Sequence, residues 1–366
     1  MAYTITSWME LQARSVTFKF RKATADLRRP PFALLLRSSV NNRFRFRMRS
    51  FVACCASLRD PDRHERYEMK AIAEAGSDDP GRSGADVRPA PVSVVVPCYR
   101  CAATIGDAIA SIVDQTVRPA EVLLVDDCSG DETLETLHRI AAAYQPGWIR
   151  VIAMPANGGP SRARNTGWRQ AQQPYIAFLD ADDTWAPRKL ELQMAVLEAD
   201  PTIALIAHPM VVRMRGTELP GLRPPVLTEI VSRRRLLLHN PFPTASVVLR
   251  RDLPLRFDES FRRSEDFLLW AQIVLSGYRC ARLNQVLAIW NRRADDATGL
   301  SDDFAAMRRT NHEARRKLLR QGLLSRPEFE FTRVVSVLRW ARRDLVLRLQ
   351  RQGPYRPGRA ESISAR

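Results

Sequence analysis

The amino-acid sequence predicts an α/β fold, with a doubly wound sheet of parallel strands, on two observations. Short apolar runs rich in β-branched residues alternate with segments of helical periodicity through the middle of the chain. Clusters of polar residues, many of them acidic, stand directly after these apolar runs. Strand–helix alternation at short spacing is typical of parallel sheets, whose ligands bind beyond the carboxyl ends of the strands. We therefore expect a binding site at that edge of the sheet.

The alternating part of the chain contains four predicted strands and three predicted helices. The strands are Val92–Val96, Glu121–Val125, Ile149–Ala153 and Tyr175–Leu179. The helices are Ala102–Gln115, Glu132–Ala143 and Ser161–Gln172. The rest of the domain is less regular, with helices expected at Pro187–Ala199, Ile230–Leu238 and Phe267–Val274, and strands at Ile203–Val212, Val247–Arg250 and Ala281–Trp290.

The run Tyr175–Leu179 ends in three carboxylates within four residues, those of Asp180, Asp182 and Asp183. A buried strand does not carry unpaired acids, because desolvation of a charge is costly. Oxygen ligands at the end of a strand suit a hard divalent cation such as Mg²⁺ or Mn²⁺. The alternative from this cluster alone is an acidic turn that caps the helix near Pro187. The first hypothesis is a metal–diphosphate site at the edge of the sheet.

Charge is distributed unevenly over the 366 residues, whose net charge is +17. Residues 1–90 carry 17 Lys and Arg against 10 Asp and Glu, and residues 301–366 carry 16 against 7, so the middle is almost neutral. We expect three parts: a basic, mostly disordered segment and linker at 1–90, a catalytic or binding domain at 91–295, and a basic helical extension with a disordered tail at 296–366. A neutral domain argues against specific nucleic-acid binding.

Two further expectations concern the N-terminal segment. A short helix is expected around Arg63–Ala75, and Met69 is an alternative start of translation.

No apolar run approaches the roughly 20 residues of a membrane span, and no convincing signal peptide is present. The six cysteines include one Cys-x-x-Cys, Cys98 to Cys101, without a second pair, so a zinc site is not expected. These features favour a cytoplasmic location with reduced thiols.

The last segment is predicted to form a basic amphipathic helix. Its apolar face consists of Phe331, Val334, Val335, Leu338, Leu345 and Leu349, and arginines occupy other positions. One interpretation is a helix packed on the catalytic domain. The other is an interfacial helix that is drawn to anionic lipid, which would place the protein at the inner face of the membrane.

Five motifs occur in a fixed order in the central domain. They are Val92-Ser93-Val94-Val95-Val96-Pro97-Cys98-Tyr99, Val125-Asp126-Asp127-Cys128-Ser129-Gly130-Asp131, Asn157-Gly158-Gly159-Pro160-Ser161-Arg162-Ala163-Arg164-Asn165-Thr166-Gly167, Asp180-Ala181-Asp182-Asp183 and Ser264-Glu265-Asp266-Phe267-Leu268-Leu269-Trp270. Each motif alone is weak. Together they resemble the serial motifs of family-2 glycosyltransferases with the GT-A fold, and the resemblance covers roughly Pro91 to Arg293.

The resemblance implies a nucleotide-sugar site built from the first four motifs. Tyr99 would stack on the nucleobase, and Asp127, or in its place Asp126, would accept a hydrogen bond from a ring nitrogen. Arg164, with Arg162 as its competitor, would pair with diphosphate oxygens. The full set of implied nucleotide-sugar-binding residues is Pro97, Tyr99, Asp127, Asn157, Arg164 and Asp180.

The resemblance also implies the chemistry. Asp182 and Asp183 would hold a divalent metal, Mn²⁺ or Mg²⁺, and Asp266 would act as the catalytic base, with Glu265 as its rival. Glu265 and Trp270 are expected on the acceptor side. A single base implies inversion at the anomeric carbon of a donor, expected to be UDP-linked, and transfer to a glycan, lipid-linked or protein acceptor. The family's usual Tyr-Arg near the closing strand is Trp290-Asn291 here, which puts a phosphate contact from that position in doubt.

Two other classes of function compete with this interpretation. A nucleotidyltransferase on a related sheet needs a Gly-rich signature after the first strand, and Cys98-Tyr99-Arg100-Cys101 contains no glycine. A non-catalytic protein that binds nucleotides or nucleic acid is supported only by the charge of the two ends of the chain.

Overall fold

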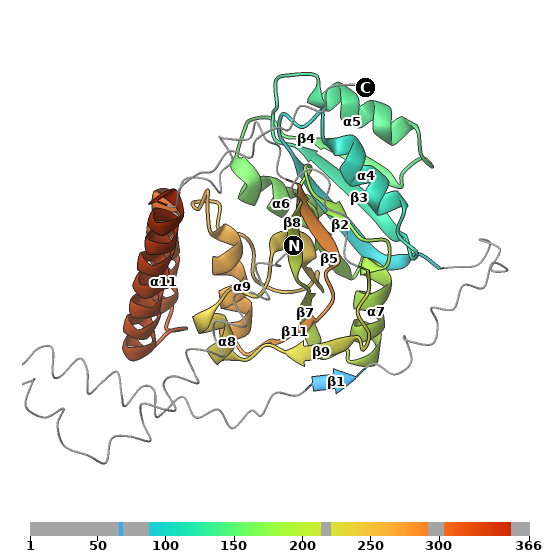
Figure 1. Ribbon diagram of the computed structural model, residues 1–366. Helices are drawn as coiled ribbons and strands as arrows, with labels where there is room; N and C mark the ends of the chain where they lie inside the picture. Colours follow the sequence, from blue (N-terminus) through green and yellow to red (C-terminus); the bar gives the residue numbers. More distant parts are fainter. Residues whose placement is uncertain (1–65, 69–87, 214–220, 292–303, 353–366) are drawn as a thin grey trace, which may run out of the picture.

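A computed structural model describes residues 66–68, 88–213, 221–291 and 304–352 of the chain (Figure 1). The expected disorder of most of residues 1–90 and of the C-terminal tail lies outside these residues. Within them, no helix has both the length and the apolarity needed to cross a bilayer. The architecture is mixed α/β, with a central sheet and helices on both of its faces.

The central sheet has nine strands in the order β1-β9-β11-β7-β10-β5-β2-β3-β4. Strands β5, β2, β3 and β4 are parallel to one another, which confirms the predicted parallel arrangement for the first half of the domain. Strand β10 is antiparallel to both β5 and β7, so the sheet as a whole is mixed. The strands are β1 Arg66–Glu68, β2 Ala90–Cys98, β3 Pro119–Asp126, β4 Ile149–Ala153, β5 Tyr175–Phe178, β7 Ile203–Ala207, β9 Leu227–Ile230, β10 Val248–Arg250 and β11 Arg279–Leu283.

A second sheet of three short strands lies beside the first. Its order is β6-β12-β8, with β12 antiparallel to β6 and parallel to β8. The bounds are β6 Thr184–Trp185, β8 Met210–Arg213 and β12 Ala288–Asn291. Because β6 follows the acidic cluster directly, this small sheet fixes the chain just beyond Asp183.

Helices cover both faces of the central sheet, and on one of them α11 lies outside α8 and α9 (Figure 1). Side chains alternate along β2, so that Val94 packs into the core under α4, α5 and α7, and Val95 into the core under α6, α9 and α10. The helices are α4 Ile105–Val113, α5 Thr133–Ala142, α6 Gly159–Gln170, α7 Lys189–Ala199, α8 Arg233–Leu238, α9 Glu265–Leu275, α10 Phe304–Arg320 and α11 Arg326–Gln352.

Three sequence predictions need correction. The strand expected at Ile203–Val212 is two strands, β7 and β8, which separate at His208-Pro209 and join different sheets. Proline has no N–H for a ladder, so it favours the break there. The strand expected at Ala281–Trp290 likewise divides into β11 and β12. The helix expected around Arg63–Ala75 is wrong in its described part, since Arg66–Glu68 forms strand β1 against β9.

Helix α6 approaches the sheet unusually closely. A Cβ atom on Gly167 would lie 2.4 Å from Cγ1 of Val95 and 3.2 Å from Cγ2 of Val125, so the helix can rest on β2 and β3 only with glycine there. This contact brings the N-terminus of α6 to the carboxyl ends of the same strands. The close approach therefore helps to build the edge at which the polar motifs meet.

Candidate functional site

Polar side chains follow three neighbouring parallel strands at their carboxyl ends. Tyr99 follows β2 and is 48% exposed, with the Arg100 guanidinium 5.3 Å from its ring centre. Asp126 ends β3, Asp127 follows it, and both are buried. Asp180 comes after β5 and keeps a third of its side chain exposed. The structure thus brings these sequence-predicted residues to one edge, with an aromatic ring accessible for stacking.

The turns at this edge have unusual backbone conformations. Arg100, Cys128 and Ser264 are the three described residues other than glycine with positive φ, at 50°, 57° and 58°. Such conformations persist where surrounding contacts enforce them, and they concentrate at functional sites. The turn after β2 is held from β3 and α5, because the Arg100 N–H donates to Ser129 Oγ at 3.1 Å and the Cys101 N–H to Thr133 Oγ1 at 3.0 Å.

Asp127 joins the end of β3 to the start of α6. Its two carboxylate oxygens accept hydrogen bonds from the N–H groups of Gly158 and Gly159, both at 2.7 Å, and its carbonyl accepts from Asn157 Nδ2 at 3.0 Å. Gly159 has φ of +80°, a conformation that suits glycine. Asp126 bonds instead to Ser129, at 2.5 Å. Asp127 therefore orders the Asn-Gly-Gly turn, and its contact with a nucleobase stays a prediction.

The guanidinium of Arg164 links two motifs that are far apart in the sequence. Its Nη2 donates to Asp180 Oδ1 at 2.6 Å and its Nη1 to Glu265 Oε1 at 2.9 Å. Arg164 is 5% exposed, and the two carboxylates raise its pKa further above its already high value against the opposing effect of burial. This buried ion-pair triad was not predicted from the sequence. Contact of Arg164 with a diphosphate stays a prediction.

Glu265 and Asp266 differ in their partners. The Glu265 carboxylate is paired with Arg164, whereas Asp266 Oδ2 receives only a long hydrogen bond from the Thr244 hydroxyl, at 3.5 Å, and Oδ1 accepts from the Phe267 N–H. Burial, and then the neighbouring charge of Glu265, raise the pKa of Asp266 to about 7. Within the described part of the chain, Asp266 forms no ion pair, and a carboxylate of this kind that binds a proton near neutral pH has the properties of a general base.

Asp183 has the environment expected of a carboxylate that binds a cation. It is 5% exposed, and its Oδ1 atom is buried without a hydrogen-bond partner among the residues that the structure describes. Burial and the charges of Asp180 and Asp182 hold the pKa of Asp183 well above its usual range. Among the described residues, no three acidic, histidine or cysteine side chains converge on one point. The residues present fit Mg²⁺ or Mn²⁺ held by one or two carboxylates, which takes its other ligands from water and phosphate.

Asn291 is a site residue whose role sequence reasoning missed. Its side-chain amide donates to the Asp182 carbonyl at 3.0 Å and to Thr184 Oγ1 at 3.3 Å, and its backbone N–H donates to Asp183. Asn291 lies on β12, which pairs with β6, so it fastens the acidic turn at both sides. The departure from the family's Tyr-Arg was the available signal. Arg292 and Arg293 lie outside the described residues.

The prediction of acceptor contact for Trp270 is corrected by its position. The indole is fully buried and packs between Phe178, 6.4 Å away, and Phe257, 5.6 Å away, measured between ring centres. Trp270 lies on the face of α9 that is turned to the sheet, so it belongs to the core and cannot meet a substrate from solvent. The other predicted residue of the acceptor side, Glu265, is occupied by Arg164.

Comparison with known proteins points in one direction. Residues 93–254 match the family model described as glycosyl transferase family 2. The chain is 34% identical over 206 residues to the succinoglycan biosynthesis protein ExoO of Rhizobium meliloti (strain 1021), a match that covers 52% of this chain and 57% of ExoO. It therefore spans less than two thirds of that relative's length.

Two further matches extend over more of the matched protein. The chain is 30% identical over 201 residues to the putative glycosyltransferase EpsE of Bacillus subtilis (strain 168), which covers 54% of this chain and 71% of EpsE. The fold is similar to that of the mannosyltransferase PcManGT of Pyrobaculum calidifontis, solved with GDP-Man and Mn²⁺, at 22% identity and a TM-score of 0.50. That alignment covers 70% of this chain and 73% of the other.

Proposed function

Because this chain belongs to glycosyltransferase family 2, we propose that it transfers a sugar from a nucleotide-diphosphate sugar to a hydroxyl group of an acceptor. The observation that carries the proposal is the buried triad of Arg164, Asp180 and Glu265. It joins the acidic turn after β5 to the start of α9, across 16 and 101 residues of sequence. The donor motifs and the Glu-Asp motif therefore form one site.

The donor is proposed to lie across the carboxyl ends of β2, β3 and β5. The exposed ring of Tyr99 offers a face for the nucleobase. The Asp127 carboxylate occupies the N–H groups of Gly158 and Gly159 at the start of α6 and so fixes the turn beside the donor. We propose a UDP-linked sugar, as the resemblance implies. The PcManGT structure was solved with GDP-Man, so the choice of nucleotide is a subject for experiment.

We propose that Asp182 and Asp183 hold Mn²⁺ or Mg²⁺ beside the donor diphosphate. The partnerless buried oxygen of Asp183 and the repulsion within the acidic turn support a cation there. When bound, the ion would offset the charge that develops on the leaving diphosphate. Asn291 and Arg164 contribute by holding the two ends of the turn, at Asp182 and Asp180.

We propose that Asp266 removes the proton from the attacking acceptor hydroxyl. Its carboxylate has no cationic partner of its own, and the Thr244 hydroxyl is the only side-chain donor within reach of Oδ2 in the described part of the chain. A single base without a nucleophilic second carboxylate supports one displacement step and inversion at the anomeric carbon. The name of the relative ExoO supports a polysaccharide product, and glycan and lipid-linked acceptors are therefore the first to test.

The decisive experiment is a screen of the full chain against UDP- and GDP-linked sugars with Mn²⁺ or Mg²⁺, with and without lipid-diphosphate-linked sugar acceptors. We expect nucleotide diphosphate release that depends on one donor and rises with an acceptor. A nucleotidyltransferase would instead break the bond between the two phosphates, transfer the nucleoside monophosphate and release the sugar 1-phosphate. Nucleotide binding without turnover of any donor would argue for a non-catalytic protein.

The pKa of Asp266 predicts a pH dependence. Only the ionised carboxylate can accept a proton, and its pKa in the free protein is raised to about 7. We therefore expect kcat/KM to rise tenfold per pH unit below about pH 7 and to level off above it. Initial rates between pH 5 and 9 check this, and a flat profile across that range would contradict it.

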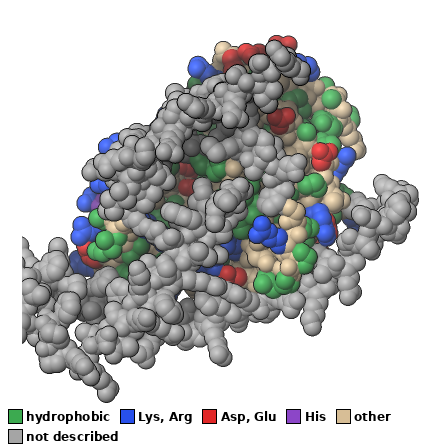
Figure 2. Space-filling view, in the orientation of Figure 1, with side chains coloured by type: hydrophobic (Ala, Val, Ile, Leu, Met, Phe, Trp, Pro, Cys, Tyr) green, Lys and Arg blue, Asp and Glu red, His purple; other side chains and the backbone are tan. Residues whose placement is uncertain are grey.

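We also propose a peripheral contact of the C-terminal helices with anionic lipid. Residues 304–352 carry 13 Lys and Arg against 4 Asp and Glu, and α11 exposes Val334, Val337 and Leu338 by 37%, 57% and 63%. Figure 2 shows basic and apolar side chains next to one another at the left edge, over the C-terminal helices. Basic residues beside exposed apolar ones are typical of helices that lie in a membrane interface.

Vesicle binding tests this contact. The full chain is expected to sediment with vesicles that contain phosphatidylglycerol and less with phosphatidylcholine alone. Val337→Asp with Leu338→Asp should weaken that binding by at least about tenfold, because it removes apolar area and adds repulsion. The control, Ala142→Asp with Ala143→Asp, adds the same charge at exposed positions around the end of α5. Equal binding by both variants would contradict a contact through α11.

A further inference from the structure

The segment that leads into the Glu-Asp motif has a strained backbone at Ser264, the residue directly before the motif. Ser264, directly before Glu265, has φ of 58° and ψ of 17°, and its side chain makes no capping bond to α9. A serine adopts the left-handed conformation only when contacts around it enforce it. The conformation of Ser264 sets the direction in which α9 begins, and so the position of the Asp266 carboxylate.

The contact that holds Ser264 comes from α10. Ser264 Oγ lies 3.1 Å from Thr310 Oγ1. The Thr310 hydroxyl also lies within hydrogen-bond distance of two carbonyls of its own helix, those of Ala306 at 3.1 Å and Met307 at 3.2 Å. Either hydroxyl can be the donor of the Ser264–Thr310 bond, and the Ser264 hydroxyl donates when the Thr310 proton is directed to one of these carbonyls.

Two cationic residues of α10 hold the same segment on either side of Ser264. The Lys317 ammonium is paired with Asp258 and lies 5.8 Å from the ring centre of Phe261. The Arg315 guanidinium lies 5.0 Å from the ring centre of Phe267. Together with Thr310, these side chains contact the chain before, at and after the strained residue.

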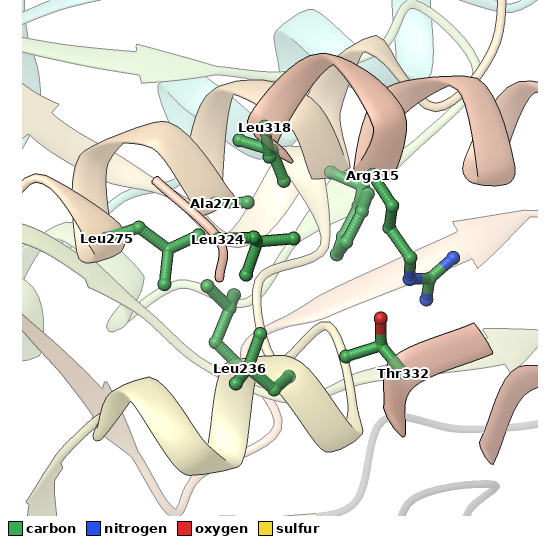
Figure 3. Close-up of a pocket in the computed structure, with 9 residues that line it drawn as sticks. Leu236, Ala271, Leu275, Arg315, Leu318, Leu324 and Thr332 are labelled. Carbon is green, nitrogen blue, oxygen red and sulfur yellow. The ribbon is translucent and has the colours of Figure 1, made fainter. Parts of the chain in front are cut away.

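An apolar layer fixes α10 in place against α9. Figure 3 shows Leu236 of α8, Ala271 and Leu275 of α9 and Leu318 of α10 converging on a small cavity. Its volume of about 10 Å³ is at the lower limit for holding one water molecule, so the apolar side chains leave little room between them. Helix α10 is thus packed on α8 and α9 through this layer, and its polar side chains contact the segment around Ser264 from there.

We propose that Thr310 is a positioning residue for the catalytic base, which acts through its hydrogen bond with Ser264, and that α10 is part of the catalytic apparatus. The proposal depends on the function assigned above to Asp266. Helix α10 lies outside residues 93–254, which match the family model. A displacement of the base by about 1 Å lowers turnover by up to roughly 10²-fold, so one hydroxyl far in sequence from the site can control the rate.

The test compares the full chain with Thr310→Val, Thr310→Ser and Ser264→Ala. We expect Thr310→Val to lower kcat by roughly tenfold to a hundredfold, with the donor KM changed less than twofold, and Thr310→Ser to retain wild-type kcat. Ser264→Ala should lower kcat by the same factor. The double variant with Ser264→Ala and Thr310→Val should lower kcat no further, because both substitutions remove the same hydrogen bond. Amide exchange of residues 258–267 should be faster in Thr310→Val.

The matched control is Thr332→Val. Thr332 is a buried threonine of α11 whose hydroxyl bonds to its own helix, at Phe329 O. Equal losses of kcat in Thr332→Val and Thr310→Val, unchanged kcat in Thr310→Val, or additive losses in the double variant would each overturn the proposal. If Thr310→Val does not fold, Ser264→Ala alone decides, and wild-type kcat in that variant refutes the proposal. If the wild type turns over no donor, the proposed function fails. The support by α10 is tested separately, and it is refuted if amide exchange of residues 258–267 is the same in Thr310→Val as in the wild type.

Discussion

Replacement of Asp266 by asparagine is expected to lower kcat by about 10²–10⁴-fold and to leave donor affinity unchanged. The amide keeps the shape of the side chain. Its oxygen can still accept from the Phe267 N–H, and its NH2 group can donate to the Thr244 hydroxyl oxygen. The amide cannot bind the acceptor's proton. Single-turnover rates with a saturating donor, together with calorimetric titration of the nucleotide, separate the two effects.

Two companion variants make this result specific. Asp252→Asn changes an exposed aspartate that is paired with Arg250 at the opposite end of β10, and it should retain full activity. Glu265→Gln leaves the buried Arg164 with one ionised partner in place of two, so we expect lower stability together with lower turnover. Full turnover in Asp266→Asn, with loss only in Glu265→Gln, would move the base to Glu265.

The parallel half of the fold was predictable because its inner strands β2, β3 and β5 are buried on both faces. Runs such as Val92–Val96 are then almost continuously apolar, with Ser93 as the exception, and the helices between them show their own period. The second half was predicted less well. There β7 and β8, and likewise β11 and β12, are consecutive strands that belong to different sheets. Pro209 is a local signal for the first break, but it does not show that the two strands join different sheets, and no proline or glycine stands between β11 and β12. Tertiary packing decides those breaks.

The candidate site shows the same division. Strand-end position was enough to predict that Tyr99, Asp127 and Asp180 meet at one edge, because parallel strands share their direction. The partners within the site were not predictable, since the Arg164–Glu265 contact spans 101 residues and the Ser264–Thr310 contact 46. Trp270 was misplaced because a motif supplies the order of residues but not which face of a helix is buried.

Replacement of Asp182 and Asp183 together by alanine is expected to abolish metal-dependent nucleotide binding while the fold survives. The acidic turn is held by Asn291 through the Asp182 carbonyl, a backbone group that the substitution keeps. Without the two carboxylates, Asp180 is the one acidic side chain left in the turn, and Arg164 already neutralises its charge. Calorimetric titrations of UDP with and without Mn²⁺ measure the loss, with Asp252→Asn as the control.

Stability without metal distinguishes this site from an acidic turn that merely caps a helix. In the wild-type protein, the Asp183 oxygen that has no hydrogen-bond partner among the described residues, and the charge repulsion around it, oppose folding. Asp183→Asn should therefore raise the melting temperature in the presence of chelator. It should also remove the further rise in melting temperature that Mn²⁺ gives the wild type. A capping role predicts the reverse, a lower melting temperature and an unchanged response to Mn²⁺. Unchanged UDP and Mn²⁺ affinities in the folded double alanine variant would contradict the metal site. A lower melting temperature for Asp183→Asn in chelator would point to the cap.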